Sequence, residues 1–281
     1  MVLKTRRGIG SYKMIAFDMD GTLLNSDLKI TPMTLAAIHR AVDAGRVIAI
    51  STGRALDEMR EYLGFMPDVR WLISCSGAYV FDLKEKRCIW SRLMDPNVVL
   101  QCLDIIAPEA PMINILTERS YVQRDQLNRI EAYQMEAYRD FYERIGTKKD
   151  DLEEFYRGDP FPIGKVNFFH VSAGSRARTR ERMLAGNVEI EMADNLTGSL
   201  ECTPKGLNKA VGAEALCRHL GIDMSEVIAV GDSDNDLPLL AAAGLSVAMG
   251  NANGNVKAAV DVVVRDNDHD GCAEAIEQFL L

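Results

Sequence analysis

Short apolar runs alternate with helix patterns along the first third of the chain. The runs are Met14–Phe17, Val47–Ile50 and Trp71–Ser74, each too short for a core helix and suited to a buried strand. Between them, Thr31-Pro32 is a favourable helix start, and a second helix is expected over 55–63. Because strands separated by helices form parallel sheets that helices cover on both faces, this order predicts an α/β fold.

The last part of the chain repeats this alternation. The expected helices lie at Leu207–Leu220, Leu237–Ala243, Asn255–Ala259 and Gly271–Leu280. The expected strands between them lie at Val227–Val230, Leu245–Met249 and Val262–Val264. Strands from the two ends of a chain can join one sheet when the segment between them folds separately. We therefore predict that residues 1–84 and 199–281 combine into one parallel-sheet domain.

The middle of the chain, residues 85–198, has a different pattern. It is richer in Tyr, Arg and Glu, and its expected strands are more polar. These strands are Met112–Leu116, Tyr121–Gln123, Val166–Val171 and Val188–Met192, and they alternate with expected helices at Val98–Ile106, Leu127–Arg144 and Arg176–Leu184. We interpret this segment as an inserted α+β domain.

The chain is acidic, with a formal net charge of −9 over 281 residues, and 47% of it is hydrophobic. This charge argues against a nucleic-acid backbone or a membrane surface as the main partner, although a local cation can still hold an anionic substrate. The six cysteines show no CxxC spacing. We therefore expect free thiols in a reducing cytosol.

The start of the chain is basic, as in a signal peptide, but only the short run Met14–Phe17 follows it before Asp18. That run is too short for the apolar region of a secretion signal. No stretch approaches the ~18 apolar residues of a membrane span. We expect a cytoplasmic protein in which the sequon Asn195-Leu196-Thr197 is not glycosylated.

Two carboxylates follow the first expected strand directly, in Phe17-Asp18-Met19-Asp20-Gly21-Thr22-Leu23. In extended backbone, residues two apart point to the same side, and Gly21 allows the chain to turn away sharply. The carboxyl end of a parallel strand is where α/β folds bind ligands. The alternative is an acidic turn that does no more than end the strand.

A second acidic cluster follows another expected strand, in Val230-Gly231-Asp232-Ser233-Asp234-Asn235-Asp236. Helix capping is a sufficient explanation for Asp234, but it does not explain why two strands both end in carboxylates. Parallel strands of one sheet end at the same edge, so the two clusters can meet. Their oxygen ligands suit Mg²⁺, which needs few protein carboxylates in addition to water and phosphate.

Two further segments suit an anion, and each has an ordinary alternative. A hydroxyl and backbone N–H groups before a helix, as in Ser51-Thr52-Gly53-Arg54, can cradle a phosphate, but they are also a common helix cap. Lys205 and Lys209 lie near the start of a helix, where a lysine is misplaced for the helix dipole. Either lysine could hold phosphoryl oxygens or be solvated.

Taken together, FDMDGTL, STGR, a lysine in PKGLNKA, and GDSDND resemble the ordered signatures of the haloacid dehalogenase superfamily. The insertion lies between the second and third signatures, as in members with the larger α/β cap. The segments 248–252 (AMGNA) and 268–271 (DHDG) resemble its Cof-type branch. The resemblance implies a Rossmann-like core domain and a cap domain that sets substrate specificity.

The resemblance also implies a role for each matching residue. Asp18 would attack phosphorus, and Asp20 would act as the acid and then the base. Mg²⁺ would bind Asp18, the backbone carbonyl of Asp20, and Asp232, with Asp236 supporting these ligands. The residues that would bind the phosphate are Thr52, Gly53, Lys209, Asn235 and the backbone of Met19. Three positions depart from the usual pattern: Ser76 replaces Asn, Ala210 replaces Gly, and Pro238 interrupts the segment after GDSDND.

The function implied is a magnesium-dependent phosphomonoester hydrolase that acts on a small phosphorylated metabolite, such as a sugar phosphate. One alternative is a phosphotransferase similar to phosphomannomutase, and another is a non-catalytic metal-binding regulator on the same fold. A weaker alternative is calcium binding, because 266–277 matches the EF-hand loop pattern although a strand is expected before it. Neither the substrate nor the oligomeric state has a recognisable sequence signal.

Overall fold

The computed structural model describes residues 12–194 and 198–281. The basic start of the chain and the sequon at 195–197 lie outside these ranges, so the expectations made for them stay predictions. The chain divides into two compact units. The first unit comprises the described residues up to Gly53, Glu61–Trp90 and Asn208–Leu281, and the second comprises Arg54–Arg60 and Ser91–Leu207.

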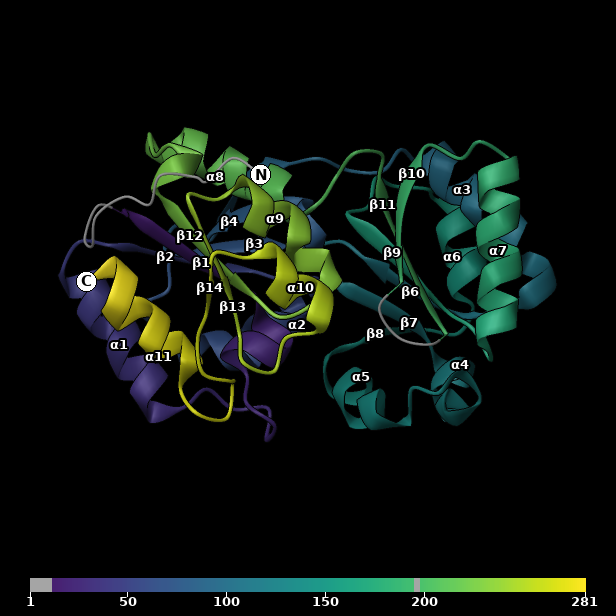
Figure 1. Ribbon diagram of the computed structural model, residues 1–281. Helices are drawn as coiled ribbons and strands as arrows, with labels where there is room; N and C mark the ends of the chain where they lie inside the picture. The colour runs from purple at the N-terminus through teal and green to yellow at the C-terminus, as the bar shows by residue number, and fades with distance from the viewer. Residues whose placement is uncertain (1–11, 195–197) are drawn as a thin grey trace. The chain divides into compact units, whose positions relative to one another are not determined.

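The first unit is built on an eight-stranded sheet with the strand order β14-β13-β12-β1-β2-β3-β4-β5 (Figure 1). The strands are β1 (Met14–Phe17), β2 (Val47–Ser51), β3 (Trp71–Ser74), β4 (Tyr79–Asp82), β5 (Arg87–Ser91), β12 (Val227–Gly231), β13 (Leu245–Ala248) and β14 (Val262–Val263). The pairs from β14 to β3 are parallel, and β4 returns antiparallel to β3. The α/β prediction is confirmed, while β4 and β5 were not foreseen.

The register of this sheet determines which residues share an edge. Phe17 at the end of β1 pairs with Val230 of β12 on one side and with Ile50 of β2 on the other. The next residues along the three strands are therefore Asp18, Gly231 and Ser51. The segments that begin at Asp18, Gly231 and Ser51 thus leave three central, neighbouring strands at the same edge of the sheet.

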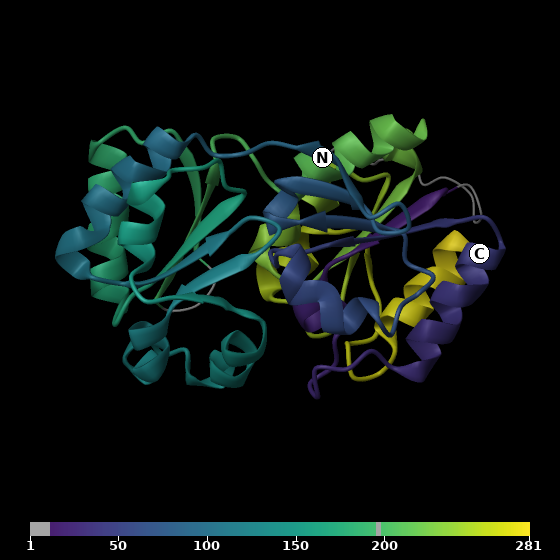
Figure 2. The same ribbon diagram turned by 180° about the vertical axis from the view of Figure 1, so that it is seen from behind.

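Helices of the first unit cover both faces of the sheet. They are α1 (Pro32–Asp43), α8 (Lys209–Leu220), α9 (Leu237–Ala242), α10 (Gly254–Ala259) and α11 (Gly271–Ala275), while α2 (Leu56–Leu63) has residues in both units. Met14 and Ala16 pack with residues of α8 and α9 in one core. On the other face, α1 and α11 lie side by side (Figures 1 and 2). As predicted, α1 begins after Thr31, whose side chain accepts a hydrogen bond from the Thr34 N–H.

The second unit has a six-stranded sheet with the order β10-β11-β9-β6-β7-β8, antiparallel except between β7 and β8. Its strands are β6 (Met112–Leu116), β7 (Ser120–Gln123), β8 (Thr147–Lys149), β9 (Lys165–Phe169), β10 (Ile190–Asp194) and β11 (Ser199–Pro204). Its helices are α3 (Pro96–Ile106), α4 (Arg124–Asn128), α5 (Arg139–Ile145), α6 (Leu152–Gly158) and α7 (Ala173–Ala185). Helices α3, α6 and α7 cover one face, and α4 and α5 lie on the other (Figure 2).

The helix predicted over Leu127–Arg144 is wrong. The segment forms α4, two short 3-10 turns at Ile130–Tyr133 and Glu136–Tyr138, and then α5. Gln134 has φ +59°, which ends helical progression. The apolar residues Ile130, Tyr133 and Met135 all pack into one core, and an unbroken helix would turn some of them away from it.

All six cysteines lie in the described ranges and are free thiols, five of them buried. Among residues 12–194 and 198–281, no helix is long and apolar enough to cross a membrane.

Candidate active site

The first acidic segment forms a single irregular turn at the end of β1. Asp18 is extended, and its N–H donates to the Val230 carbonyl at 3.0 Å. Residues Met19–Leu23 form a π-helical turn in which Asp20 and Gly21 are not helical. Gly21 has φ +80°, and a Cβ there would lie 2.6 Å from Asp232 Oδ2. Position 21 therefore requires glycine, both for its backbone conformation and for its small size. The turn leaves Asp18 buried and Asp20 exposed.

Lys209 is buried among the carboxylates. Its Nζ lies 2.5 Å from Asp18 Oδ1 and 2.6 Å from Asp236 Oδ1, and only 1% of its side chain is exposed. The helix that carries it starts at Asn208, whose side chain accepts from the Ala210 N–H at 3.0 Å. Lys205 is exposed and belongs to the second unit. Of the two candidate lysines, the structure brings Lys209 to the acidic cluster.

A tight turn after β3 packs against the start of α8 and so helps to seat Lys209. Cys75, Ser76 and Gly77 all have positive φ, and a Cβ at Gly77 would lie 2.2 Å from the Asn208 carbonyl oxygen. The Ser76 N–H also donates to the Thr52 carbonyl at 3.0 Å. Ser76, which replaces the Asn of the usual family pattern, thus lies in a strained turn between the Thr52 segment and α8, the helix that begins at Lys209.

Asp232 and Asp236 complete the cluster. Asp232 Oδ1 accepts from the Thr22 hydroxyl at 2.9 Å. Asp236 Oδ2 accepts from the N–H groups of Asp232 and Ser233, and its Oδ1 faces Lys209. Asp236 therefore orients both the backbone of Asp232 and the ammonium group. The sequence motif contains Thr22, but its bond to Asp232, 210 positions away, is visible only in the structure.

Burial dominates the electrostatics of the cluster. It raises the pKa of Asp18 well above its usual value; the charge of Lys209 lowers it in part, and Asp236 and Asp20 raise it further. Burial also raises the pKa of Asp232 to about 6, although the hydrogen bond from Thr22 lowers it in part. Burial opposes the charge on Lys209, but Asp18 and Asp236 together raise the pKa of Lys209. One ammonium group thus faces more carboxylates than it can neutralise.

The donor set fits a divalent cation. Asp18, Asp232 and Asp236 each offer a carboxylate oxygen, and these oxygens lie within 4.8 Å of one another. Hard oxygen donors and excess negative charge are the conditions that Mg²⁺ requires. The bonds described engage both oxygens of Asp236 but one oxygen each of Asp18 and Asp232. These bonds favour Asp18 and Asp232 as direct ligands and Asp236 as their support. The exposed carboxylate of Asp20 is outside this group; only its backbone carbonyl is the expected ligand.

The predicted phosphate-binding residues lie around the same edge. Thr52 is buried after β2, and its N–H donates to the Ile73 carbonyl at 2.9 Å. Gly53 and Asn235 are partly exposed. Asn235 belongs to the short turn Asp234–Asp236, and its Oδ1 accepts from the Ser233 hydroxyl at 2.9 Å. Met19 is buried. All of these residues belong to the first unit.

The EF-hand interpretation of 266–277 does not fit the structure. The strand β14, not a helix, precedes the loop, whereas an EF-hand needs a helix on each side. Asp268 accepts two hydrogen bonds from Ser26, and Glu277 pairs with Arg40. The carboxylates of this pattern are therefore used in contacts within the chain.

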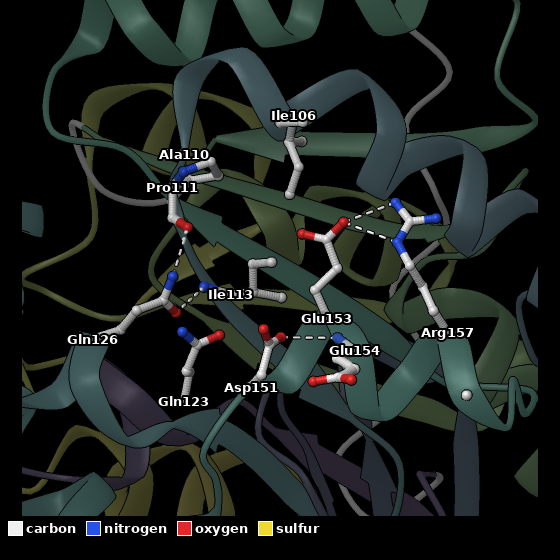
Figure 3. A pocket seen from close by; sticks show the side chains of 12 residues that line it. Ile106, Ala110, Pro111, Ile113, Gln123, Gln126, Asp151, Glu153, Glu154 and Arg157 are labelled. Atoms are coloured by element: carbon white, nitrogen blue, oxygen red, sulfur yellow. Dashed lines mark hydrogen bonds and ion pairs between the residues drawn. The ribbon is translucent and has the colours of Figure 1, made fainter.

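A separate cavity of about 680 Å³ lies within the second unit, between α3, β6, β7 and α6 (Figure 3). Its polar groups bond one another: Glu153 pairs with Arg157, and Gln126 bonds the backbone of Pro111 and Ile113. The contacts of Glu153, Arg157 and Gln126 thus lie within the second unit, and this cavity lacks the buried lysine among carboxylates found at the end of β1.

The fold and the site together define an α/β protein with an acidic, lysine-bearing centre at the carboxyl edge of a parallel sheet. A model of the haloacid dehalogenase-like hydrolase family matches residues 15–276. The chain therefore belongs to this family of enzymes, in its Cof-type branch, as the sequence motifs predicted.

Similar proteins agree with this assignment. The 5-amino-6-(5-phospho-D-ribitylamino)uracil phosphatase YcsE of Bacillus subtilis is 29% identical over 276 residues, which cover 96% of each chain. The HMP-PP phosphatase of Serratia proteamaculans is 30% identical and covers 86% of this chain and 85% of its own. The crystal structure of a haloacid dehalogenase-like hydrolase from Bacteroides thetaiotaomicron superposes with a TM-score of 0.82 at 26% identity, over 95% of this chain and 98% of that one.

Proposed function

We propose that this protein is a magnesium-dependent phosphomonoester hydrolase that acts on a small phosphorylated metabolite through an aspartyl-phosphate. The observation that carries the proposal is the position of Lys209, buried between Asp18 and Asp236 at the sheet edge where Asp232 also lies. A fixed cation among carboxylates is an arrangement for binding a phosphoryl group and for stabilising the charge of its transfer. Membership of a hydrolase family supports the same reaction.

In the proposed reaction, a carboxylate oxygen of Asp18 attacks phosphorus, and the bond from phosphorus to the leaving oxygen breaks. Asp20 gives its proton to that oxygen. Asp20 then takes a proton from water, which attacks the aspartyl-phosphate and releases inorganic phosphate and free Asp18. Splitting the reaction in this way lets one group serve as acid and then as base. The exposure of Asp20 and the burial of Asp18 suit these two roles.

Phosphate binding is assigned to Lys209, Thr52, Gly53, Asn235 and the backbone of Met19. We assign Mg²⁺ to Asp18, the backbone carbonyl of Asp20, and Asp232, with Asp236 holding Asp232 and Lys209 in place. When bound, Mg²⁺ offsets the charge of the carboxylates and of the phosphoryl oxygens.

We further propose that the insertion predicted at 85–198 acts as a mobile cap that sets substrate specificity. It is supported by the compact second unit, which has its own sheet and its own cores. Closure of such a domain would exclude water from the reaction. We also propose a cytoplasmic location with no nucleic-acid or membrane partner. The net charge of −9 argues against those two partners.

The substrate class we propose is a phosphate ester of a small polar metabolite, such as a sugar phosphate. The similar proteins named above act, by their names, on a phosphorylated ribitylamino compound and on HMP-PP. A phosphotransferase related to phosphomannomutase would share the first half of the reaction, with a sugar as the acceptor in place of water. A non-catalytic regulator is disfavoured because Asp18, Asp20, Lys209 and Asp232 are all present.

A screen of phosphorylated metabolites tests the proposal, with excess Mg²⁺ or with excess chelator. We expect release of inorganic phosphate with Mg²⁺ and none with chelator. Full activity in chelator would contradict the metal assignment. Transfer of phosphate to an added sugar without release of inorganic phosphate would favour the phosphotransferase.

A further inference from the structure

Two asparagine side chains from the C-terminal part of the chain bind the irregular turn that carries Asp20. The Asn251 Nδ2 donates to the Gly21 carbonyl at 2.7 Å, and the Asn267 Nδ2 donates to the Leu24 carbonyl at 2.8 Å. Asn251 Oδ1 in turn accepts from the Asn267 N–H at 3.1 Å. The two asparagines therefore hold one another and bind the backbone of Gly21 and of Leu24.

Further contacts tie the same two segments together. Asp268 accepts from the N–H and the hydroxyl of Ser26 at 2.8 and 2.7 Å, and Asp270 accepts from the Thr31 hydroxyl at 2.5 Å. The loop that matches the EF-hand pattern thus supplies a series of contacts to the chain after Asp20. Of all the residues contacted, Gly21 and Leu24, which the asparagine pair binds, lie closest to Asp20 along the sequence.

The Gly21 carbonyl is the contact that bears on Asp20. Asp20 has φ −80° and ψ 118°, and Gly21 has φ +80°, so regular helix geometry does not define this backbone. Glycine is the residue with the widest choice of backbone angles. A hydrogen bond to its carbonyl restricts that choice, and with it the direction in which the neighbouring Asp20 side chain points.

We propose that Asn251, seated by Asn267, is a positioning residue for Asp20. It holds the Gly21 peptide so that the Asp20 carboxyl group is presented for proton transfer. This inference rests on the proposed role of Asp20 as the acid and base of the hydrolase. It goes beyond that role by assigning Asn251 and Asn267 to the support of the proton transfer.

The test compares Asn251→Ala with Asn97→Ala, a control at an exposed position of α3. For each enzyme, kcat/KM is measured with a phosphate ester of an alcohol and with p-nitrophenyl phosphate, whose leaving group needs no proton. The ratio kcat/KM reports the steps up to departure of the leaving group. We expect Asn251→Ala to lose about 10- to 100-fold on the alcohol ester and several-fold less on p-nitrophenyl phosphate. Asn97→Ala should match the wild type on both.

A double-mutant cycle with Asp20→Asn completes the test. If Asn251 acts through Asp20, Asn251→Ala should change kcat/KM little once Asp20 is already replaced. Equal losses on both substrates, additive losses in the cycle, or no loss in a folded variant would each overturn the inference. If Asn251→Ala does not fold by circular dichroism, Asn267→Ala is assayed in the same way and judged by the same outcomes.

This experiment distinguishes an error in the role of Asp20 from an error in the role of Asn251. If Asp20→Asn alone lowers kcat/KM equally for both substrates, the proposed acid role of Asp20 is wrong, and the inference falls with it. If Asp20→Asn shows the leaving-group dependence but Asn251→Ala is additive with it, only the role of Asn251 is wrong.

Discussion

Replacing Lys209 by methionine would remove an ammonium group that contacts two buried carboxylates while keeping most of the side-chain volume. Lys209 is 1% exposed and faces Asp18 and Asp236 at 2.5 and 2.6 Å. Because the side chain of Met is close to the lysine stem in size, the main effect is loss of charge rather than formation of a cavity. Two carboxylates would then remain buried without their partner.

Breaking a buried ion pair by removing one partner costs about 3–5 kcal/mol. We therefore expect Lys209→Met to lower the free energy of unfolding of the first unit by about 3–5 kcal/mol in the presence of chelator. Loss of a preorganised cation at the phosphoryl group should also reduce kcat/KM, by about 10²–10³-fold. The matched control is Lys205→Met, which changes an exposed lysine four positions away and should alter stability by no more than about 0.5 kcal/mol.

Tryptophan fluorescence is a suitable assay because the chain has two tryptophans, Trp71 and Trp90, both in the first unit. Both pack into its hydrophobic core. Urea unfolding followed by this signal, in chelator, gives the stability of that unit. If Lys209→Met and Lys205→Met unfold at the same urea concentration with equal slopes, the buried ion pairs of Lys209 do not stabilise the first unit.

Three further predictions concern the pair Asp18 and Asp20, the turn at Gly21, and the buried His170. Asp18→Asn should abolish the covalent step, whereas Asp20→Asn should slow turnover by about 10²–10⁴-fold. The loss in Asp20→Asn should be smaller with p-nitrophenyl phosphate. If the labelled phosphoryl group of a substrate is trapped on Asp20 instead of Asp18, this assignment is wrong. Gly21 has φ +80°, and a Cβ added there would lie 2.6 Å from Asp232 Oδ2. Gly21→Ala should therefore destabilise the first unit by about 1–3 kcal/mol and weaken Mg²⁺ binding. Unchanged Mg²⁺ affinity by titration calorimetry would refute the predicted clash. Burial lowers the pKa of His170 to about 4, so the unfolded chain binds a proton there before the folded chain does as the pH falls from 6.5 toward 4. The free energy of unfolding should drop by up to roughly 3 kcal/mol over this range. Urea unfolding at each pH should show a smaller drop in His170→Asn, and an equal drop in both proteins would contradict this prediction.

The alternation of short apolar runs with helix patterns was enough to predict the parallel sheet. Because parallel strands end at one edge, it also indicated that the segments with Asp18 and Asp232 can meet. The register of the sheet brings the end of β2, at Ser51, to the same edge. Local rules sufficed for the start of α1 at Thr31 as well, because a helix cap depends on neighbours in sequence. The family motifs pointed to Lys209, which the structure buries beside Asp18 and Asp236.

Tertiary structure decided what depends on residues far apart in the chain. The break in the helix expected over 127–144 follows from packing into a shared core, which outweighs local helix propensity. Asn251 and Gly21 are separated by 230 positions, and nothing in either local sequence indicates that they bond. Periodicity and capping report interactions over a few residues, whereas these contacts form only when the sheet brings the two ends of the chain to one edge.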